Sequence, residues 1–577
     1  RAHNPLVLGS SPSGPTRKLI KIKELKYITN PNQKLSCTEQ NSNETNSNET
    51  LVNKDFARYN RFIPSEISVF YIDFAGYSRF ITSGMWNIMQ KIIGRKSEIQ
   101  ILKKMLSSND AEFLALYGRR RVGKTYLIRT FFRDSSCIFF EATGQKDGTM
   151  KGQLLNFAES ISKTFFQGLN VRSPENWKDA FKSLTVLIKK MDKDKKVVLF
   201  FDELPWMVTP RSQFMQHLYY IWNTEWSDLG NLKLIVCGSA ASWMLEHFIH
   251  TKGGLHNRIT GRICLKPFNL EETRQYLKYR EISLNHQQVL ELYMVMGGIP
   301  HYLKSVSKGL SAVQNINNIC FTKDGLLFDE FQKLYASLYK DSGVHIKLIR
   351  LIASSRQGIS LNEIIEKDKN LSSGGTLRRR LLELEAAGFI HGMVPYGNKK
   401  KGIFYRILDE YTYFYLKWIE PISQSVDLLG EASCWGKISH TPNWYNWTGY
   451  VFESVCFKHV DKIRRALGID KIISKVGSWR YVSGLSDEGK GAQIDLLFDR
   501  ADRVVTICEI KSGFGKFSIN KAYAENLRNK IAVYKNQINT KKQIFIAMIT
   551  THGLDKNEYS EELVSNEITL KDLFGEN

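Results

Sequence analysis

The sequence has few cysteines and no cysteine pair of the kind that binds zinc. Its 577 residues contain 8 cysteines, and none of them forms a C-x-x-C pair. The spacing therefore predicts neither a disulfide framework nor a zinc site. Several of these cysteines fall within apolar runs, as buried free thiols do. This usage favours a reducing compartment, and we expect a cytoplasmic protein.

Long hydrophobic runs are also missing. The most apolar early stretch, residues 67–81, is interrupted by Asp73 and Arg79, whereas a transmembrane helix needs about 20 apolar residues. The first residues show no signal-peptide pattern. The sequence therefore predicts no membrane partner.

Acidic residues are scarce relative to basic ones. The chain has 58 Asp and Glu against 81 Lys and Arg, which gives a formal net charge of +23. Such an excess favours a polyanionic partner, and nucleic acid is the usual one. A lysine-rich composition without a specific partner explains the same number, so charge alone leaves both interpretations open.

Residues 1–84 differ in composition from the rest of the chain. They are rich in Ser, Asn and Pro, with Asn-Ser-Asn-Glu-Thr repeated at 41–50, and such a composition does not bury enough apolar surface to fold. We interpret them as a disordered extension of doubtful relevance, with Met85 or Met89 as a natural start. At roughly 100–200 residues per domain, the whole length predicts three or four domains.

Beyond Met85 the pattern is that of an α/β fold. Short apolar runs at 113–117, 137–140, 197–201 and 232–237 are separated by segments of helical periodicity. Short buried strands that alternate with helices indicate a parallel sheet. The stretch from about 270 to 390 is helical in pattern, and a mixed α/β region follows Lys401.

A glycine-rich segment follows the first of these strands and matches the P-loop pattern G-x-x-x-x-G-K-[ST]. Its glycines allow backbone N–H groups to surround phosphates, its lysine reaches the β and γ phosphates, and its threonine hydroxyl binds magnesium. The helix that follows offers its positive end to the same phosphates. The pattern predicts ATP and Mg²⁺ as ligands, bound by Gly118, Arg119, Arg120, Arg121, Val122, Gly123, Lys124 and Thr125.

Two acids end the strand at 197–201, as the second half of such a site requires. We predict that Asp202 holds the magnesium ion and that Glu203 polarises the attacking water. After the next strand, Ser239 is the candidate sensor of the γ-phosphate, although Gly-Ser is a common turn. Arg258 or Arg262 could act as an arginine finger, and a basic surface arginine is an equally good interpretation of each.

The order of these motifs resembles the archaeal-type ATPase family of the AAA+/STAND assemblage. The resemblance rests on Ile93-Gly94-Arg95, the P-loop, Asp202-Glu203, Gly238-Ser239, Gly261-Arg262 and Gly297-Gly298-Ile299-Pro300. It covers roughly residues 90–575 and implies a P-loop ATPase core, a helical lid, a winged helix-turn-helix and a C-terminal α/β domain similar to restriction endonucleases. We place these parts at 85–268, 269–340, 341–410 and 411–577.

The third part has the pattern of a winged helix. Ser360 and Glu363 form a capping box, and a helix over 376–387 carries three consecutive arginines. We expect that helix in the major groove of double-stranded DNA and the lysines of the following hairpin against phosphates. Many winged helices only mediate packing, which remains the alternative. The candidate DNA contacts are Arg378, Arg379, Arg380, Lys399, Lys400 and Lys401.

The fourth part contains acids inside apolar strands, where acids are disfavoured without a function or a partner. Asp495 lies in the run 491–498, and Glu509 and Lys511 lie two apart in the run 504–511, so both project from one face. Together they resemble the PD-(D/E)XK nuclease motif, which implies metal binding by Asp495 and Glu509, with Glu453 as the helix acid of that motif and Gln493 assisting. A salt bridge in a fold that has lost its activity is the alternative.

Three functions remain compatible with these patterns. The first is an ATP-regulated nuclease, the second an ATP-dependent switch that binds DNA without cleavage, and the third a chaperone-like ATPase that acts on protein. Glu203 favours ATP turnover over pure switching. An arginine finger from a neighbouring subunit would require a homo-oligomer, and the sequence leaves the oligomeric state open.

Overall fold

The computed structural model describes residues 92–133, 135–249, 258–356, 358–371, 374–394, 396, 402–423, 434–481 and 491–576. All of them belong to one compact unit, residues 88–577. The expected N-terminal extension at 1–84 and the hairpin lysines Lys399, Lys400 and Lys401 lie outside the described residues. Within those residues, no helix combines the length and the apolar character that crossing a bilayer demands.

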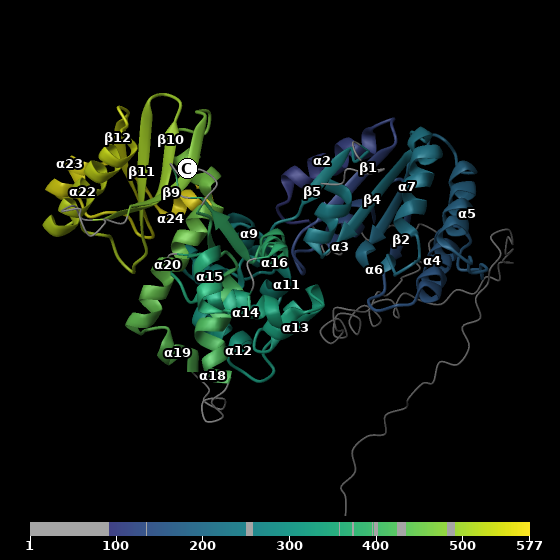
Figure 1. Ribbon diagram of the computed structural model, residues 1–577, viewed down its shortest axis with the longest axis horizontal. Coiled ribbons are helices and arrows are strands. Elements are labelled where there is room, and N and C mark those ends of the chain that lie inside the picture. Colours follow the sequence, from purple (N-terminus) through teal and green to yellow (C-terminus); the bar gives the residue numbers. More distant parts are fainter. Residues whose placement is uncertain are drawn as a thin grey trace, which may run out of the picture. The chain divides into compact units, whose positions relative to one another are not determined.

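The first sheet is parallel throughout, as the sequence predicts (Figure 1). Its strand order is β2-β3-β4-β1-β5, and every residue of β3 and β4 is buried. One strand, β4, therefore separates the strand before the P-loop from the strand that ends in Asp202. The strands are β1 (Glu112–Tyr117), β2 (Ile138–Thr143), β3 (Val197–Asp202), β4 (Leu232–Gly238) and β5 (Gly261–Cys264).

Helices cover both faces of this sheet because successive strand residues point to opposite sides. Leu114 and Leu116 of β1 share a core with α2 and α3, whereas Phe113 and Ala115 share a core with α4, α5 and α7. The helices are α2 (Lys96–Ser107), α3 (Lys124–Arg133), α4 (Met150–Phe165), α5 (Trp177–Lys189), α6 (Leu204–Met207), α7 (Phe214–Thr224), η2 (Trp226–Asp228), α8 (Ala241–Met244) and η3 (Leu245–Ile249).

The segment after β5 is helical, in agreement with the sequence pattern. Asn269 and Glu272 form a capping box at the start of its first helix, and Gly297 ends the second helix with a φ of 63°. Gly298 also has a positive φ, and a Cβ there would lie 2.1 Å from the Phe268 carbonyl oxygen, so only glycine fits. The helices are α9 (Leu270–Tyr279), α10 (His286–Met296), α11 (Pro300–Leu303), α12 (Ala312–Cys320) and α13 (Glu330–Leu338).

Three helices and a small antiparallel sheet follow. The predicted capping box is present, because Ser360 Oγ accepts from Glu363 N and Glu363 Oε2 accepts from Ser360 N. The sheet order is β6-β8-β7. The elements are α14 (Ser342–Ala353), β6 (Ile359–Ser360), α15 (Leu361–Lys367), α16 (Gly375–Ala386), β7 (Ile390–Met393) and β8 (Phe404–Ile407).

The last part has a mixed sheet with strand order β13-β12-β11-β10-β9. β9, β10 and β11 pair antiparallel, whereas β11, β12 and β13 pair parallel. Leu496 and Cys508 share a core with α20, and Leu497 and Ile507 share another with Tyr534 of α22, so these helices cover opposite faces. The strands are β9 (Ser474–Tyr481), β10 (Ala492–Arg500), β11 (Val504–Lys511), β12 (Gln543–Thr550) and β13 (Val564–Ile568).

The helix that carries Glu453 is separated from the next helix by a single residue. It begins at Pro442 and stops at Lys458, and a second helix starts at Val460. The break lies at His459, whose buried Nε2 accepts a hydrogen bond of 2.9 Å from the backbone N–H of Leu270. The helices of this part are α17 (Glu410–Phe414), η4 (Tyr415–Ile419), α18 (Glu420–Ser423), α19 (Cys434–Ile438), α20 (Pro442–Lys458), α21 (Val460–Ala466), α22 (Lys521–Ile538), α23 (Glu558–Leu563) and α24 (Leu570–Phe574).

Candidate nucleotide site and carboxylate cluster

The glycine-rich loop joins β1 to α3, where the sequence places it. Gly118 has a φ of 141°, and a Cβ there would lie 2.3 Å from the Leu265 carbonyl oxygen, while Gly123 has a φ of 92°. Both positions therefore require glycine. Because α3 begins at Lys124, the backbone N–H groups at its N-terminus are available to an anion beside the loop.

Lys124 is held inside this loop. Its buried ammonium group donates hydrogen bonds of 3.0 Å to the Gly118 carbonyl oxygen and 3.1 Å to the Arg119 carbonyl oxygen. Burial of an ammonium group is costly without acceptors. The two loop carbonyl oxygens therefore stabilise the positive charge of Lys124. Phosphate oxygens of a bound nucleotide would take their place as acceptors.

Thr125 and Asp202 are in direct contact, although 77 residues separate them. Thr125 Oγ1 donates a hydrogen bond of 2.7 Å to Asp202 Oδ2, and the other carboxylate oxygen accepts from Glu203 N at 3.0 Å. Burial raises the pKa of Asp202 above its ordinary value, and no described Lys or Arg forms an ion pair with it. The Thr125 hydroxyl group and the Asp202 carboxylate, which has no Lys or Arg partner among the described residues, together suit Mg²⁺, because Mg²⁺ prefers oxygen ligands.

Glu203 and Ser239 are also brought together. The Ser239 hydroxyl group donates to Glu203 Oε1, and the Ser239 backbone N–H donates to Glu203 Oε2 at 3.2 Å. Glu203 has a positive φ of 46°, an uncommon conformation for a non-glycine residue. The strand order explains the contact, since β4 lies next to β3 and the carboxyl ends of parallel strands meet at one edge.

The two candidate finger arginines form no hydrogen bond or ion pair with this cluster among the residues that the structure describes. Arg258 and Arg262 are exposed. Arg262 is on β5, close to Tyr117. Burial raises the pKa of Tyr117, and the charge of Arg262 opposes this rise. Within the described residues, neither guanidinium group forms an ion pair with a carboxylate or a hydrogen bond to the glycine-rich loop.

Two arginines of the loop make contacts that the sequence did not predict. The Arg119 guanidinium group binds both carboxylate oxygens of Asp409, with NH2 at 3.0 Å from Oδ2, and all these groups are buried. Arg121 forms an ion pair of 2.5 Å with Glu330, which also accepts from the Tyr302 hydroxyl group at 3.0 Å. The loop is thus tied to α13 and to the start of α17.

Arg95, in the Gly94-Arg95 pair before α2, supports the same loop from the other side. It donates to the Val122 carbonyl oxygen at 3.2 Å and to the Lys266 carbonyl oxygen at 2.7 Å. Its guanidinium group also lies 4.6 Å from the centre of the Phe268 ring, a cation–π distance. The motif therefore has a structural role in fixing the loop, whereas the sequence indicated only that it belongs with the P-loop.

The acids of the last part also converge. The antiparallel ladder pairs Leu496 with Cys508, so Asp495 comes next to Glu509 at a point where β10 has a register irregularity between Ile494 and Leu497. Asp495 Oδ2 accepts from Ile510 N at 3.3 Å. Burial, followed by the charge of Asp495, raises the pKa of Glu453 to about 8. Gln493, predicted to assist, is half-buried on β10 opposite Arg480.

Glu509 is already bound by residues of α22 that sequence patterns did not reveal. Lys530 Nζ lies 2.7 Å from both carboxylate oxygens, and the Tyr523 hydroxyl group donates at 3.2 Å. Lys511 Nζ lies 5.3 Å from the centre of the Tyr523 ring. Within the described ranges, no group of three or more His, Cys, Asp or Glu side chains is arranged to hold a metal ion. In this arrangement Lys530 therefore occupies both carboxylate oxygens of Glu509.

The raised pKa of Glu453 predicts a pH-dependent stability. The folded protein holds the Glu453 proton more tightly than the unfolded chain, so this contribution is fully present below about pH 4. It is lost as the pH rises from the ordinary value of 4.5 through about 8. Glu453→Gln is therefore expected to melt at a higher temperature than the unmodified protein at pH 8.5, with little difference at pH 5.

Thermal melting at the two pH values tests this expectation. Glu159→Gln, which removes an exposed carboxylate of α4, is the matched control. It should melt at the same temperature as the unmodified protein at each of the two pH values. An equal effect of both variants would contradict a buried, protonated Glu453.

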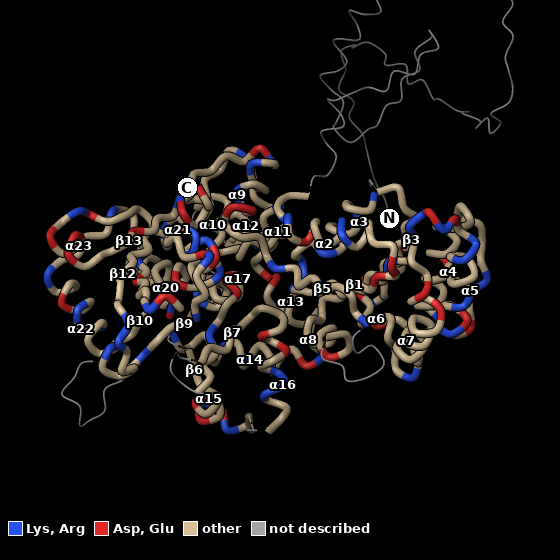
Figure 2. Tube along the Cα trace, turned by 90° about the horizontal axis from the view of Figure 1, so that it is seen from above, with Lys and Arg blue, Asp and Glu red and all other residues tan. Residues whose placement is uncertain are grey.

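The three arginines of α16 face two environments. Arg378 and Arg379 are exposed and Arg380 is half-buried. The ion pairs that Arg379 makes with Glu383 at 3.6 Å and Arg380 makes with Asp341 at 3.9 Å are loose, so these charges remain open to solvent. Lys and Arg positions are spread over many elements rather than gathered on one (Figure 2).

Comparison with known proteins finds a family match for the first part of the chain. Residues 92–306 match the model of a family described as an ATPase domain predominantly from Archaea. The uncharacterized protein MJECL04 of Methanocaldococcus jannaschii is 24% identical over 425 residues, which cover 73% of this chain and 87% of that protein. The uncharacterized ATP-binding protein MJ0423 of the same organism is 45% identical over 42 residues, which cover 7% of this chain and 71% of that protein.

Solved structures align over a little more than half of the chain. The Walker-type ATPase PABY2304 of Pyrococcus abyssi has a TM-score of 0.41 and 18% identity, and the match covers 56% of this chain and 96% of that one. The ORC2 protein of Aeropyrum pernix, in complexes with ADPNP and ADP, has a TM-score of 0.39 and 14% identity, with 58% and 94% covered.

Proposed function

We propose that this protein is a magnesium-dependent ATPase that acts on double-stranded DNA, a proposal supported by the match of residues 92–306 to a family described as an ATPase domain predominantly from Archaea. The observation that carries the ATPase part is the contact between Thr125 and Asp202, next to a Glu203 that Ser239 holds in place. In this proposal ATP binding or turnover controls the access of the later parts of the chain to DNA.

The residues of the site have separate tasks in this proposal. Mg²⁺, held by Thr125 and Asp202, would neutralise charge on the phosphates. The Lys124 ammonium group moves from the loop carbonyls to the β and γ phosphate oxygens. The Glu203 carboxylate orients and polarises the attacking water, and Ser239 reports the γ-phosphate through its hydrogen bonds to Glu203.

The loop arginines supply a route from nucleotide to the helical parts. A phosphate bound beside Arg119 and Arg121 competes with Asp409 and Glu330 for the same guanidinium donors, since both kinds of oxyanion take bidentate hydrogen bonds from arginine. Nucleotide state would thereby bias the positions of α13 and α17.

We interpret the elements between 342 and 407 as a winged helix. The order α14, β6, α15, α16, β7, β8, with an antiparallel β7–β8 hairpin, is compatible with this fold. The second and third helices would form the helix-turn-helix, with α16 entering the major groove. The net charge of +23 gives the electrostatic term that DNA binding needs.

Removing the three arginines of α16 tests the DNA interface. Arg378→Ala/Arg379→Ala/Arg380→Ala is expected to weaken duplex binding at least tenfold and to reduce the salt slope by about 2–3, because each lost phosphate contact removes about 0.9 from the slope. Fluorescence anisotropy with a labelled duplex at several salt concentrations gives both quantities. Unchanged DNA affinity would contradict a role of α16 in DNA binding.

A matched control removes the same charge elsewhere. Lys163, Arg172 and Lys182 belong to the ATPase part, and Arg172 and Lys182 are exposed there. Changing these three residues to alanine should leave the duplex affinity near that of the unmodified protein. A comparable loss would mean that net charge, rather than α16, determines the binding.

DNA cleavage is a second candidate function, favoured by the convergence of Glu453, Asp495, Glu509 and Lys511. The order α20, α21, β9, β10, β11, α22, β12 is compatible with a restriction-endonuclease-like domain. The ion pair of Lys530 with Glu509 argues for the DNA-binding switch, because it occupies a carboxylate that a metal would need.

Plasmid nicking separates the two candidates. Purified protein would be incubated with plasmid and Mg²⁺ or Mn²⁺, with and without ATP, beside Asp495→Ala and Lys511→Ala. Nicking that disappears in both variants would establish a nuclease. Intact plasmid, with ATP turnover retained, would assign the carboxylates a structural role and leave the switch. Duplex binding that weakens as salt rises would count against a chaperone-like ATPase, the third function compatible with the sequence.

A further inference from the structure

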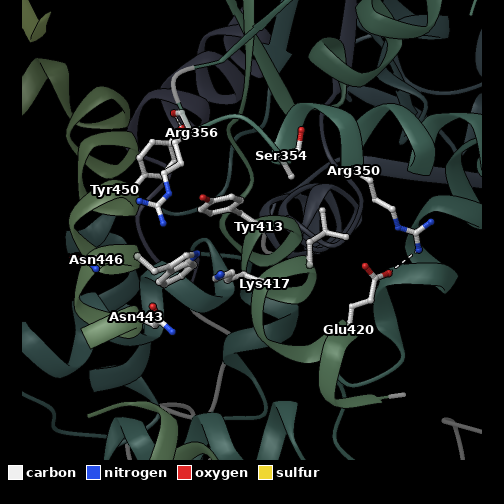
Figure 3. A pocket seen from close by; sticks show the side chains of 12 residues that line it. Arg350, Ser354, Arg356, Tyr413, Lys417, Glu420, Asn443, Asn446 and Tyr450 are labelled. Carbon is white, nitrogen blue, oxygen red and sulfur yellow. Dashed lines mark hydrogen bonds and ion pairs between the residues drawn. The ribbon is translucent and has the colours of Figure 1, made fainter. Parts of the chain in front are cut away.

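A cavity of about 450 Å³ lies among α14, α17, η4, α18 and α20, and none of the glycine-rich loop residues lines it. Its volume falls in the range of small-molecule sites, about 300–1,000 Å³. Figure 3 shows its labelled side chains converging from these helices around an open centre. Nothing in the proposed ATPase cycle uses it.

The lining is strongly basic. It contains Arg350, Arg356 and Lys417 against the single carboxylate of Glu420, a formal balance of +2. Glu420 binds Arg350 at 2.6 Å, and no described carboxylate forms an ion pair with Arg356 or Lys417. In the view of Figure 3 the side chains of Arg356 and Lys417 both appear beside Tyr413, and the charge of Arg356 acts on the Tyr413 hydroxyl group. Arg356 and Lys417, which have no carboxylate partner among the described residues, favour an anion with several oxygens.

The rest of the lining suits an aromatic group with polar edges. Tyr413 and Trp447 contribute rings that stack on one another at 5.9 Å and 16°, and Tyr450 adds a third ring. The buried Trp447 indole N–H has no hydrogen-bond partner among the described residues. Asn446, exposed on α20, offers an amide donor and an acceptor. Nucleobases stack on such rings and bond through such edges.

We propose that this cavity binds one nucleotide unit, with the phosphate on Arg356 and Lys417 and the base among Tyr413, Trp447 and Tyr450. The unit is either a free nucleotide or an unpaired nucleotide of DNA, since both present the same base and phosphate. Tyr450 lies one helical turn before Glu453 on α20, so a nucleotide bound here is adjacent to the carboxylate cluster. The site would place a strand end or a flipped base beside those acids, whether or not they cleave.

Binding to the full-length Lys124→Ala protein isolates this site from the P-loop. The probes are AMP, followed by calorimetry, and a labelled 5′-phosphorylated single strand of about 8 nucleotides, followed by anisotropy. Arg356→Ala/Lys417→Ala is expected to weaken the probe that binds roughly tenfold or more. Asn446→Glu should act in the same direction by repelling the phosphate, and its exposed position leaves the core intact.

The control and the outcomes decide the proposal. Arg172→Ala/Lys182→Ala removes two exposed cations of the ATPase part and should leave both affinities unchanged. Loss of AMP binding in the cavity variants identifies a free nucleotide, and loss of oligonucleotide binding alone identifies DNA. Cavity variants that bind both probes like the control, or an unmodified cavity that binds neither, would overturn the proposal. ATP turnover in proteins that retain Lys124 is measured separately, so failure of the proposed ATPase function is distinguishable.

Discussion

Glu203→Gln is expected to bind ATP as the unmodified protein does and to hydrolyse it about 10²–10⁴-fold more slowly, the range that general-base residues contribute. Glutamine keeps the size of the side chain and an acceptor for the Ser239 hydrogen bonds. It loses the negative charge that polarises water. Binding should persist because phosphate contacts come from the loop and Lys124 rather than from Glu203.

Equilibrium binding of ATP and steady-state phosphate release measure the two properties separately. Glu159→Gln, an exposed substitution on α4, is the control and should leave both unchanged. Retained turnover in Glu203→Gln would remove this residue from the reaction. A parallel loss of binding and turnover would assign it to the architecture of the site instead.

Asp409→Ala is expected to cost about 3–5 kcal/mol of unfolding free energy, the range for removal of one partner from a buried ion pair. The substitution leaves the Arg119 guanidinium group buried without its carboxylate. It also removes the acceptor of the Thr412 N–H at the start of α17. Denaturant unfolding measures the cost, and nucleotide affinity should change in the same variant because Arg119 belongs to the loop.

Two comparisons isolate the ion pair from the cap. Asp409→Asn keeps an acceptor for Thr412 and removes the charge, so it should retain most of the destabilisation. Glu141→Gln breaks the more exposed pair with Arg129 and should cost only about 0–1 kcal/mol. An Asp409→Ala protein no less stable than Glu141→Gln, with unchanged ATP affinity, would contradict the coupling of the loop to α17.

Local patterns predicted the parts of the site that lie at strand ends. The glycine-rich loop, Asp202 with Glu203, and Ser239 each follow an apolar run, and parallel strands bring their carboxyl ends to one edge of the sheet. The face shared by Glu509 and Lys511 followed from their spacing of two. These predictions needed only periodicity and strand order.

Contacts across long sequence separations were not predictable in the same way. Arg119 and Asp409 are 290 residues apart, and neither lies in a pattern that points to the other. Lys530 lies 21 residues after Glu509. The sequence pattern of its helix does not indicate that the two side chains pair. Such pairs depend on how the helices pack against the rest of the fold. No local spacing of residues in a single sequence predicts that packing.

Steady-state hydrolysis of ATP by the unmodified protein and by Lys124→Ala, each with Mg²⁺ and with EDTA, tests the central claim most directly. The account predicts turnover only when Lys124 and Mg²⁺ are both present, together with a large loss of ATP affinity in the variant. Nucleotide affinity and turnover that survive Lys124→Ala would contradict the account, because the Gly118–Thr125 loop would then not be the site.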